Sequence, residues 1–207
     1  MLDLWFHREV LPRLRGAAFL VRYADDFVIA FEREDDALRV HDVLPKRFAS
    51  FGLELHPEKT RLLDFRRPRY GGGDAPVSFD LLGFTHYWGK SRPGASVIKR
   101  KTMKTRLRRA LRATSQWCSG HRHDPIGVQQ AALGRQIRGH CAYYGITGNA
   151  RSLAVFRYAV LRIWRKWLRR RSNKARKAWS WWAELLERYP LPPAYVVHST
   201  YRPVASP

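Results

Sequence analysis

The sequence predicts an α+β domain followed by a strongly basic helical domain. Strand-like and helix-like patterns alternate over the first 95 residues, whereas amphipathic helical patterns dominate the rest of the chain. The charge changes at the same place: residues 1–95 carry 15 Lys and Arg against 14 Asp and Glu, and residues 96–207 carry 24 against 3. We therefore expect two domains, 1–95 and 96–207, with the boundary in the polar stretch 89–96.

Two apolar runs near the start of the chain predict a pair of strands. Residues 17–23 and 27–31 are rich in β-branched and aromatic side chains, and Ala24-Asp25-Asp26 separates them. A break this short predicts a tight turn, which places Asp25 and Asp26 at the tip of a β-hairpin.

A helix is expected after the hairpin. Apolar residues recur at spacings of three and four over residues 37–51, in a helix that begins near Asp35 and is closed by Gly52. Pro45 lacks a backbone donor and should kink or interrupt this helix.

The remainder of the first domain predicts short strands. Apolar residues at 53–55 and 62–65 flank a loop over 56–60, and both segments have the composition of strands. The glycine-rich turn 71–74 then leads to a further strand region over 77–88.

Four helices are expected in the basic half. The first carries an apolar stripe from Met103 to Trp117 with cations on its other face. Asp124 followed by Pro125 predicts the start of the second, because an N-cap acceptor and a proline at the first position are typical of helix starts. Asn149 can cap the third, whose apolar stripe is expected at Leu153, Phe156, Val160, Trp164 and Trp167 or Leu168. Residues 179–187 predict a short fourth helix.

The composition limits the class of function. A formal charge of +22 and a pI near 11.0 argue against a neutral metabolic enzyme and favour a polyanionic partner. Cys118 and Cys141 cannot form a disulfide framework or a zinc site, even with His121 and His123 nearby, and are expected to be buried thiols. No apolar stretch is long enough to cross a bilayer, so we expect an intracellular, cytoplasmic protein.

The paired carboxylates of the hairpin are candidate metal ligands. Two adjacent carboxylates repel each other unless a cation lies between them, and Mg²⁺ prefers such oxygen ligands. An Asp-Asp dipeptide is also a common solvated turn, so the pair Asp25 and Asp26 does not by itself establish a metal site.

The residues around the carboxylates resemble a known family. Tyr23-Ala24-Asp25-Asp26 between apolar strands resembles the catalytic hairpin of reverse transcriptases, and its context resembles the group II intron-encoded reverse transcriptase/maturase family. Residues 51–60 resemble the family segment whose lysine lies near the incoming triphosphate, and Leu82-Gly83-Phe84 resembles the primer-grip strand. Residues 99–171, with Arg138-Gly139-His140-Cys141 at their centre, resemble the thumb or maturase-specific domain.

This resemblance implies a partial polymerase palm followed by an all-α basic thumb/maturase domain, and it implies roles for single residues. Asp25 would ligate the catalytic Mg²⁺ pair with support from Asp26, and Tyr23 would shape the environment of the primer end. Lys59 would neutralise or protonate the pyrophosphate leaving group, or it is an ordinary solvated lysine. Gly83 and Phe84 would position the primer strand, although ordinary strand packing would explain the presence of these two residues equally well.

The sequence departs from the family pattern at the metal site. The family carries a further metal-binding Asp and the fingers upstream of the hairpin, whereas 22 residues precede Tyr23 here. Asp3 and Asp80 are at the wrong positions for that ligand. We therefore expect an incomplete two-metal site and no polymerase activity from this chain alone.

Two groups of cations in the basic half are expected to contact phosphates, because neutralising phosphates releases condensed counterions. Trp179, Trp181 and Trp182 flank the second group and offer bases a stacking surface, although most tryptophans of this half are expected in the core. The expected RNA-binding residues are Lys99, Arg100, Lys101, Lys104, Arg108, Arg109 and Arg112 in the first group, and Arg165, Lys166, Arg169, Arg170, Arg171, Lys174, Arg176 and Lys177 in the second.

Three interpretations of the function remain open from the sequence. The leading one is the C-terminal portion of a group II intron reverse transcriptase/maturase, an RNA-directed DNA polymerase that also binds intron RNA and assists its splicing. The second is a noncatalytic RNA-binding maturase module, and the third is a decayed reading frame. The expected partners are intron RNA, an RNA/DNA primer-template and a separate chain that supplies the upstream palm and fingers.

Overall fold

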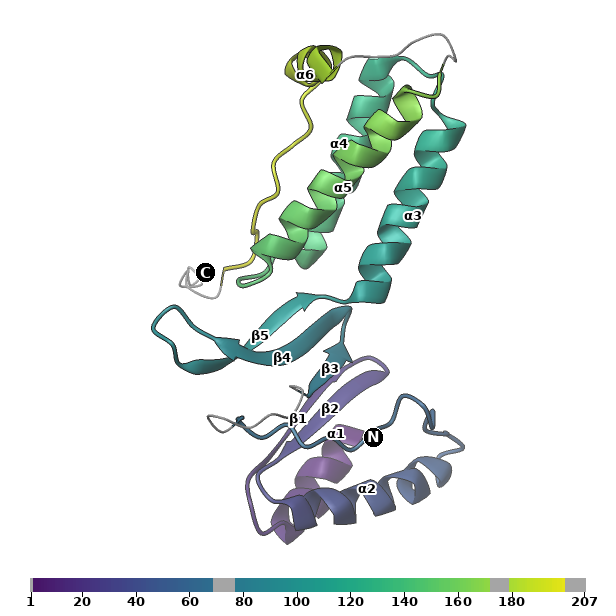
Figure 1. Cartoon of the computed structure of the whole chain (residues 1–207). Helices are drawn as coiled ribbons and strands as arrows, with labels where there is room; N and C mark the ends of the chain where they lie inside the picture. Colours follow the sequence, from purple (N-terminus) through teal and green to yellow (C-terminus); the bar gives the residue numbers. More distant parts are fainter. Residues whose placement is uncertain (1, 69–76, 172–178, 200–207) are drawn as a thin grey trace, which may run out of the picture. The chain divides into compact units, whose positions relative to one another are not determined.

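The computed structural model describes residues 2–68, 77–171 and 179–199. It divides the chain into two compact units, of which the first is Met1–Leu82 with Lys90–Ser96 and the second is Gly83–Gly89 with Val97–Pro207. Figure 1 shows the helices and strands of both units. The predicted glycine turn 71–74 lies outside the described residues.

The first unit begins with helical turns and a β-hairpin. Helix α1 (Leu2–Trp5) continues into a π-helical turn and a 3₁₀ turn that end at Arg13. Strands β1 (Ala18–Tyr23) and β2 (Asp26–Phe31) then pair antiparallel, from Ala18 opposite Phe31 to Tyr23 opposite Asp26. The predicted hairpin is confirmed, with Asp26 as the first residue of β2.

Helix α2 (Glu34–Ala49) buries the apolar face that its spacing predicts. Val40 and Leu44 lie in the core of the first unit together with Trp5 and Phe6. The expected interruption at Pro45 is wrong, because the helix continues through it. Leu44 and the half-buried Phe48 anchor it in the core on either side of the missing backbone donor.

Gly52 closes the helix as the sequence predicts. Its φ of +67° lies in the left-handed region, which glycine adopts without steric cost. The Gly52 N–H donates to the Ala49 carbonyl and the Leu53 N–H donates to the Phe48 carbonyl, both at 3.0 Å. This pair of hydrogen bonds is the Schellman motif, which satisfies carbonyls at the end of a helix.

Two of the strands expected after this helix are absent from the structure. Residues 53–55 and 62–65 are irregular, and Leu53 and Leu62 are exposed. A strand needs a hydrogen-bonded neighbour, which the described part of the chain does not provide for either segment. The expected strand region 77–88 forms β3 (Ser78–Leu81) and the beginning of β4, with a turn between them.

The second unit contains a β-hairpin and helices. Strands β4 (Phe84–Lys90) and β5 (Ser96–Thr102) precede α3 (Lys104–Gly120), α4 (Ile126–Tyr144), α5 (Ala150–Leu168) and α6 (Trp179–Arg188). The expectation of an all-α region from residue 96 is therefore wrong for β5. Val97 and Ile98 are β-branched and follow a Pro-Gly turn, a strand pattern that the surrounding polar residues obscured.

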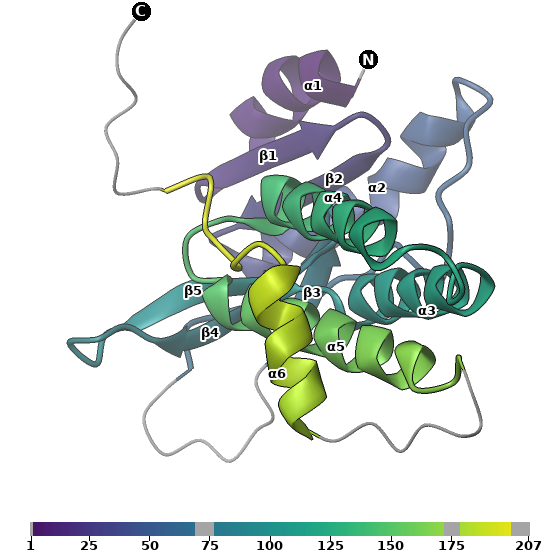
Figure 2. The same ribbon diagram turned by 90° about the horizontal axis from the view of Figure 1, so that it is seen from above.

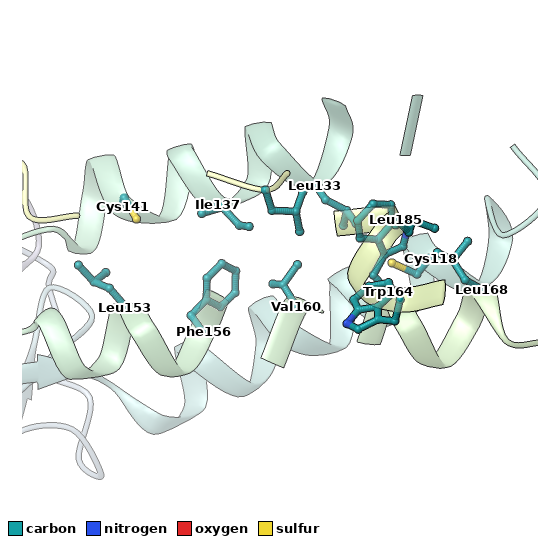
Figure 3. Close-up of a cluster of buried hydrophobic side chains, with 12 residues drawn as sticks. Cys118, Leu133, Ile137, Cys141, Leu153, Phe156, Val160, Trp164, Leu168 and Leu185 are labelled. Carbon is teal, nitrogen blue, oxygen red and sulfur yellow. The ribbon is translucent and has the colours of Figure 1, made fainter. Parts of the chain in front are cut away.

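The helices of the second unit pack around one apolar core. Figure 2 shows α3, α4 and α5 side by side, and Figure 3 shows the side chains between them. The stripe predicted for α5 is confirmed, since every member from Leu153 to Leu168 is at most 2% exposed except the half-buried Trp167. The fully buried core residues are Cys118, Leu133, Ile137, Cys141, Leu153, Phe156, Val160, Trp164 and Leu168.

The prediction that the side chains of Asp124 and Asn149 cap helices is wrong. Asp124 lies before α4 and Asn149 lies before α5, but neither side chain caps its helix. Asn149 is 1% exposed and instead accepts from the Thr102 N–H at 3.0 Å, while its amide donates to Thr102 Oγ1 and to the Tyr144 carbonyl. Asn149 thus ties β5 and the end of α4 to the start of α5.

Both cysteines are buried free thiols, as expected. Burial raises the pKa of the Cys118 thiol to about 12, so this group stays protonated and unreactive at neutral pH. Within the described residues, no helix combines the length and the apolar character needed to cross a bilayer.

Candidate functional site

The β1–β2 turn of the first unit presents two carboxylates to solvent. Asp25 lies in the two-residue turn, and Asp26 is paired with Tyr23 across the hairpin. Because paired residues point to the same face of a sheet, Asp26 shares a face with Tyr23, which is 69% exposed. The sequence therefore placed the candidate metal ligands correctly at the hairpin tip.

The backbone of this turn is strained at Ala24. Its φ of +51° is in the left-handed region, which costs a residue with a Cβ about 1 to 2 kcal/mol. Hairpin turns of this length need a positive φ, and glycine usually supplies it. Strain of this kind gathers at functional sites, where it fixes side chains in a required position. Here the strained residue directly precedes Asp25.

An arginine stabilises the base of the turn. The Arg22 guanidinium donates to the Ala24 carbonyl at 3.0 Å and forms an ion pair with Asp3, with Nε 2.9 Å from Oδ2. The hydrogen bond from Arg22 lowers the pKa of Asp3, and the hydrogen bond to Asp3 raises the pKa of Arg22. Asp3 is thus occupied by Arg22, and the nearby charge of Asp25 adds to the same effect on Arg22.

The turn carboxylates suit a partly hydrated Mg²⁺ ion. Mg²⁺ is commonly bound by one or two carboxylates and completes its sphere with water and substrate phosphates. Asp25 and Asp26 are both exposed and can offer oxygens to such an ion. Among the described residues, no group of three or more His, Cys, Asp or Glu side chains is arranged to hold a metal. The fit is therefore to a two-carboxylate site.

Lys59 is exposed in a loop between α2 and β3. The turn around it is closed by hydrogen bonds from the Lys59 and Thr60 N–H groups to the His56 carbonyl, at 3.1 and 2.9 Å. Within the part of the chain that is described, no hydrogen bond or ion pair joins Lys59 to Asp25 or Asp26. The predicted role of Lys59 at the pyrophosphate leaving group stays a prediction.

Gly83 and Phe84 occupy a turn and the start of a strand in the second unit. Gly83 has a φ of +78°, and an added Cβ would lie 3.1 Å from the Tyr144 hydroxyl. Its carbonyl accepts from the Met103 N–H at 2.9 Å. The Phe84 ring stacks on Tyr143, with centroids 6.2 Å apart, and meets Tyr144 edge-on. These residues join β4 to α3 and α4, and their predicted role in primer binding stays a prediction.

The first group of predicted RNA-binding cations lies on β5 and α3. Lys101 Nζ sits 4.8 Å from the centre of the Tyr87 ring, and the Lys99 stem packs over Gly89. The cations of α3 are exposed, and Lys104, Arg108 and Arg112 follow one another at spacings of four along one face. The β5–α3 cations therefore form a strip of positive charge next to the helix core.

In the second group of predicted RNA-binding cations, which begins at Arg165, some side chains lie against aromatic rings and one points into the helical unit. Arg165 stacks on Trp179, and Arg170 lies over Trp167 at 5.1 Å. Arg171 instead points inward, where it donates to the carbonyls of Arg122 and Asp124 and holds the α3–α4 connection. Lys174, Arg176 and Lys177 lie outside the described residues.

Sequence reasoning missed two residues of this surface. Arg162 lines a cavity with Arg165, Lys166 and Arg169. It precedes those three residues by three, four and seven positions, the spacing of one helix face, which could have identified it. The exposed Tyr158 ring lies beside Arg162 and was not recognised either.

The basic residues of the second unit keep their charge available. Every ion pair found among the described residues joins side chains between positions 3 and 66. Cations without carboxylate partners repel one another and attract polyanions. This arrangement fits a surface for phosphates.

A comparison with known protein families gives a match that includes the β1–β2 hairpin. Residues 5–86 match the family described as reverse transcriptase (RNA-dependent DNA polymerase). The matched stretch is less than half of the chain and contains the carboxylate turn, Lys59 and the Leu82–Phe84 segment. This part of the chain is therefore similar to reverse transcriptases. A comparison with curated proteins found no match to the chain.

Proposed function

We propose that this chain is the C-terminal portion of a group II intron reverse transcriptase/maturase. The first unit would contribute the end of a polymerase palm, and the second would act as a thumb/maturase domain that binds intron RNA and assists splicing. One observation carries the proposal: Asp25 and Asp26 lie at an exposed, strained hairpin turn inside the stretch that matches reverse transcriptases.

Asp25 and Asp26 would hold Mg²⁺ in this role. When bound, the metal stabilises the attacking and leaving oxygens of phosphoryl transfer. The strained Ala24 backbone and the hydrogen bond from Arg22 to the Ala24 carbonyl would fix the conformation of the turn that carries both carboxylates. Tyr23, beside Asp26 on the exposed face, would offer an apolar surface to the primer end.

With two carboxylates alone, we expect no polymerase activity from this chain by itself. A two-metal mechanism needs both ions held together, and the described residues offer no third acidic ligand near the turn. We propose that a separately supplied upstream palm and fingers fragment completes the site. Within the described residues, β1 and β2 form a two-stranded sheet, which leaves edges to which another strand can pair.

Primer extension on an RNA template tests this proposal. We expect no extension by the chain alone, extension when the upstream fragment is added, and its loss in Asp25→Asn. Asp42→Asn, which removes a carboxylate from the exposed side of α2, is the matched control and should extend normally. Extension that survives Asp25→Asn in the same mixture would contradict the assignment of the turn.

A noncatalytic RNA-binding maturase module is the second candidate. The observation that favours it is the contrast between two turn carboxylates and the many cations of the second unit that, where the structure describes them, form no ion pair. If RNA binding and assistance of splicing persist in Asp25→Asn, and no mixture extends a primer, this second function replaces the first.

A further inference from the structure

The exposed side of α5 carries a cationic groove. Arg162, Arg165, Lys166 and Arg169 line a cavity of about 180 Å³, which we name the α5 groove. Their spacing of three, four and seven positions places all four on one face of the helix. The groove is therefore built by a single rigid element.

The charge of the α5 groove is not neutralised within the described chain. None of its four cations forms an ion pair with a described carboxylate, and residues 96–207 contain only three acids. Like charges at these spacings destabilise a helix. The helix dipole favours cations in the last turn, which accounts for Arg165 and Lys166 but not for Arg162. An anion in the groove would remove the repulsion.

Exposed aromatic rings accompany these cations. Trp179 is 67% exposed, and the Arg165 guanidinium stacks over its ring at 4.0 Å from the centroid. Tyr158 is 62% exposed, with Arg162 at 5.9 Å. Tryptophan side chains usually bury most of their surface in folded proteins. An exposed indole with an arginine stacked on it is therefore a candidate surface for the stacking of a base. Cations and open rings thus occur together on this surface.

We infer that the α5 groove and Trp179 bind a single-stranded polynucleotide, with a base stacked on the indole and phosphates on the cations. The inference rests on the proposed nucleic acid partner and specifies where and in which form the strand binds. A duplex keeps its bases stacked on one another and would engage the cations alone. Rings and cations together match the pattern of single-strand binding, in which stacking and phosphate contacts both contribute.

Fluorescence anisotropy of the full chain with labelled oligonucleotides tests the inference. The probes are an oligouridylate, an oligothymidylate and an RNA duplex of the same length. Trp179→Ala should weaken binding of the single strands by about fivefold or more, because base–aromatic stacking contributes substantially per base. The same variant should leave duplex binding unchanged, and Trp179→Phe, which keeps a ring, should restore much of the loss. Comparing the affinities for oligouridylate and oligothymidylate shows whether the bound strand is RNA or DNA.

A second pair of variants tests the groove itself. Arg162→Gln with Arg169→Gln should reduce the salt slope for single strands by about 1.4, since each phosphate contact contributes about 0.7. Arg135→Gln with Arg151→Gln removes the same charge from exposed positions outside the groove and should have a smaller effect. Circular dichroism of each variant controls for folding.

Several outcomes would overturn the inference. Equal loss of single-strand and duplex binding in Trp179→Ala would show no stacking role, and equal slopes in the two arginine pairs would show no specific groove. Binding of an acidic polypeptide that competes fully with oligouridylate and depends equally on Trp179 would identify a protein ligand. If the wild-type chain binds no nucleic acid at low salt, the proposed function fails together with the inference, whereas unaffected variants refute the inference alone.

Discussion

The two units use their charged residues in different ways. In the first unit, acids and bases bind each other, as in the pairs of Asp3 with Arg22 and Asp64 with Arg66. Hydrogen bonds from Arg66 lower the pKa of Asp64 to about 2. In the second unit the described cations contact aromatic rings and backbone carbonyls instead of carboxylates. Nearly all of the formal charge of +22 lies in residues 96–207, which carry a net +21, and the contrast shows that this charge is not consumed by ion pairs among the described residues.

The two cores differ as well. The second unit buries large side chains between its helices, with Trp164 fully enclosed and its Nε1 donating to Gln129 at 2.9 Å. The first unit buries one face of its hairpin and leaves Phe19 and Val21 exposed on the other. The helical unit is therefore expected to be the more stable of the two, and the hairpin the more dependent on partners.

The largest expected effect is on the core of the second unit. Trp164→Ala removes a fully buried ring and leaves the Gln129 acceptor unpaired, so we expect a loss of about 3 to 5 kcal/mol in unfolding free energy. Trp179→Ala, at an exposed position, should change stability by less than about 0.5 kcal/mol. Urea unfolding of both variants measures the difference. Equal losses would show that the described core does not carry the stability of this unit.

The second-largest expected effect is a difference between the two units in how their stability depends on pH. Burial lowers the pKa of His140 from its ordinary value of 6.5 to about 4, and its ring stacks on Phe156. The unfolded chain takes up this proton first, so the second unit should lose stability as the pH falls from about 6.5 to 4. The loss should level off below pH 4 at roughly 3 kcal/mol.

The first unit should respond at lower pH. Hydrogen bonds from arginines lower the pKa values of Asp3, Asp35 and Asp64, so the stability that they contribute is lost only as the pH falls below about 3.8. Tryptophan fluorescence mainly follows the second unit, which holds seven of the eight tryptophans, all except Trp5. A His140→Phe variant that kept the slope between pH 6.5 and 4 would refute the assignment.

The smallest expected effect is metal binding at the turn. Two exposed carboxylates leave most of the coordination sphere to water, so Mn²⁺ should bind weakly and broaden amide resonances near Asp25 and Asp26. Asp25→Asn should reduce this broadening, and Asp42→Asn should not. Broadening confined to other acidic residues would contradict a metal site at the hairpin.

The sequence predicted features that depend on local pattern. The hairpin, the end of α2 at Gly52 and the stripe of α5 follow from spacing and from residue preference, and the structure confirms all three. The failures concern long-range pairing. The strands expected at 53–55 and 62–65 are missing because no neighbour pairs with them in the described chain, which no local pattern can reveal.

Two buried polar residues illustrate the same limit. Asp36 is 1% exposed and accepts from the N–H groups of Arg15 and Gly16 at 2.9 Å, across about 20 positions of sequence. Asn149 bonds Thr102 across 47 positions. Both had the appearance of ordinary helix-start residues. Their partners depend on the tertiary fold.

A salt series of RNA binding tests most directly whether the available charge belongs to the second unit. One variant changes Arg108, Arg109 and Arg112 of α3 to Glu. The control variant changes Arg8, Arg13 and Arg61 to Glu, which removes the same charge from exposed positions of the first unit. Filter binding of the wild-type chain should weaken steeply with salt. The α3 variant should reduce the log–log slope by roughly 2 to 3, and the first-unit variant should leave it nearly unchanged. Equal reductions in the two variants, or a wild-type slope near zero, would contradict this division.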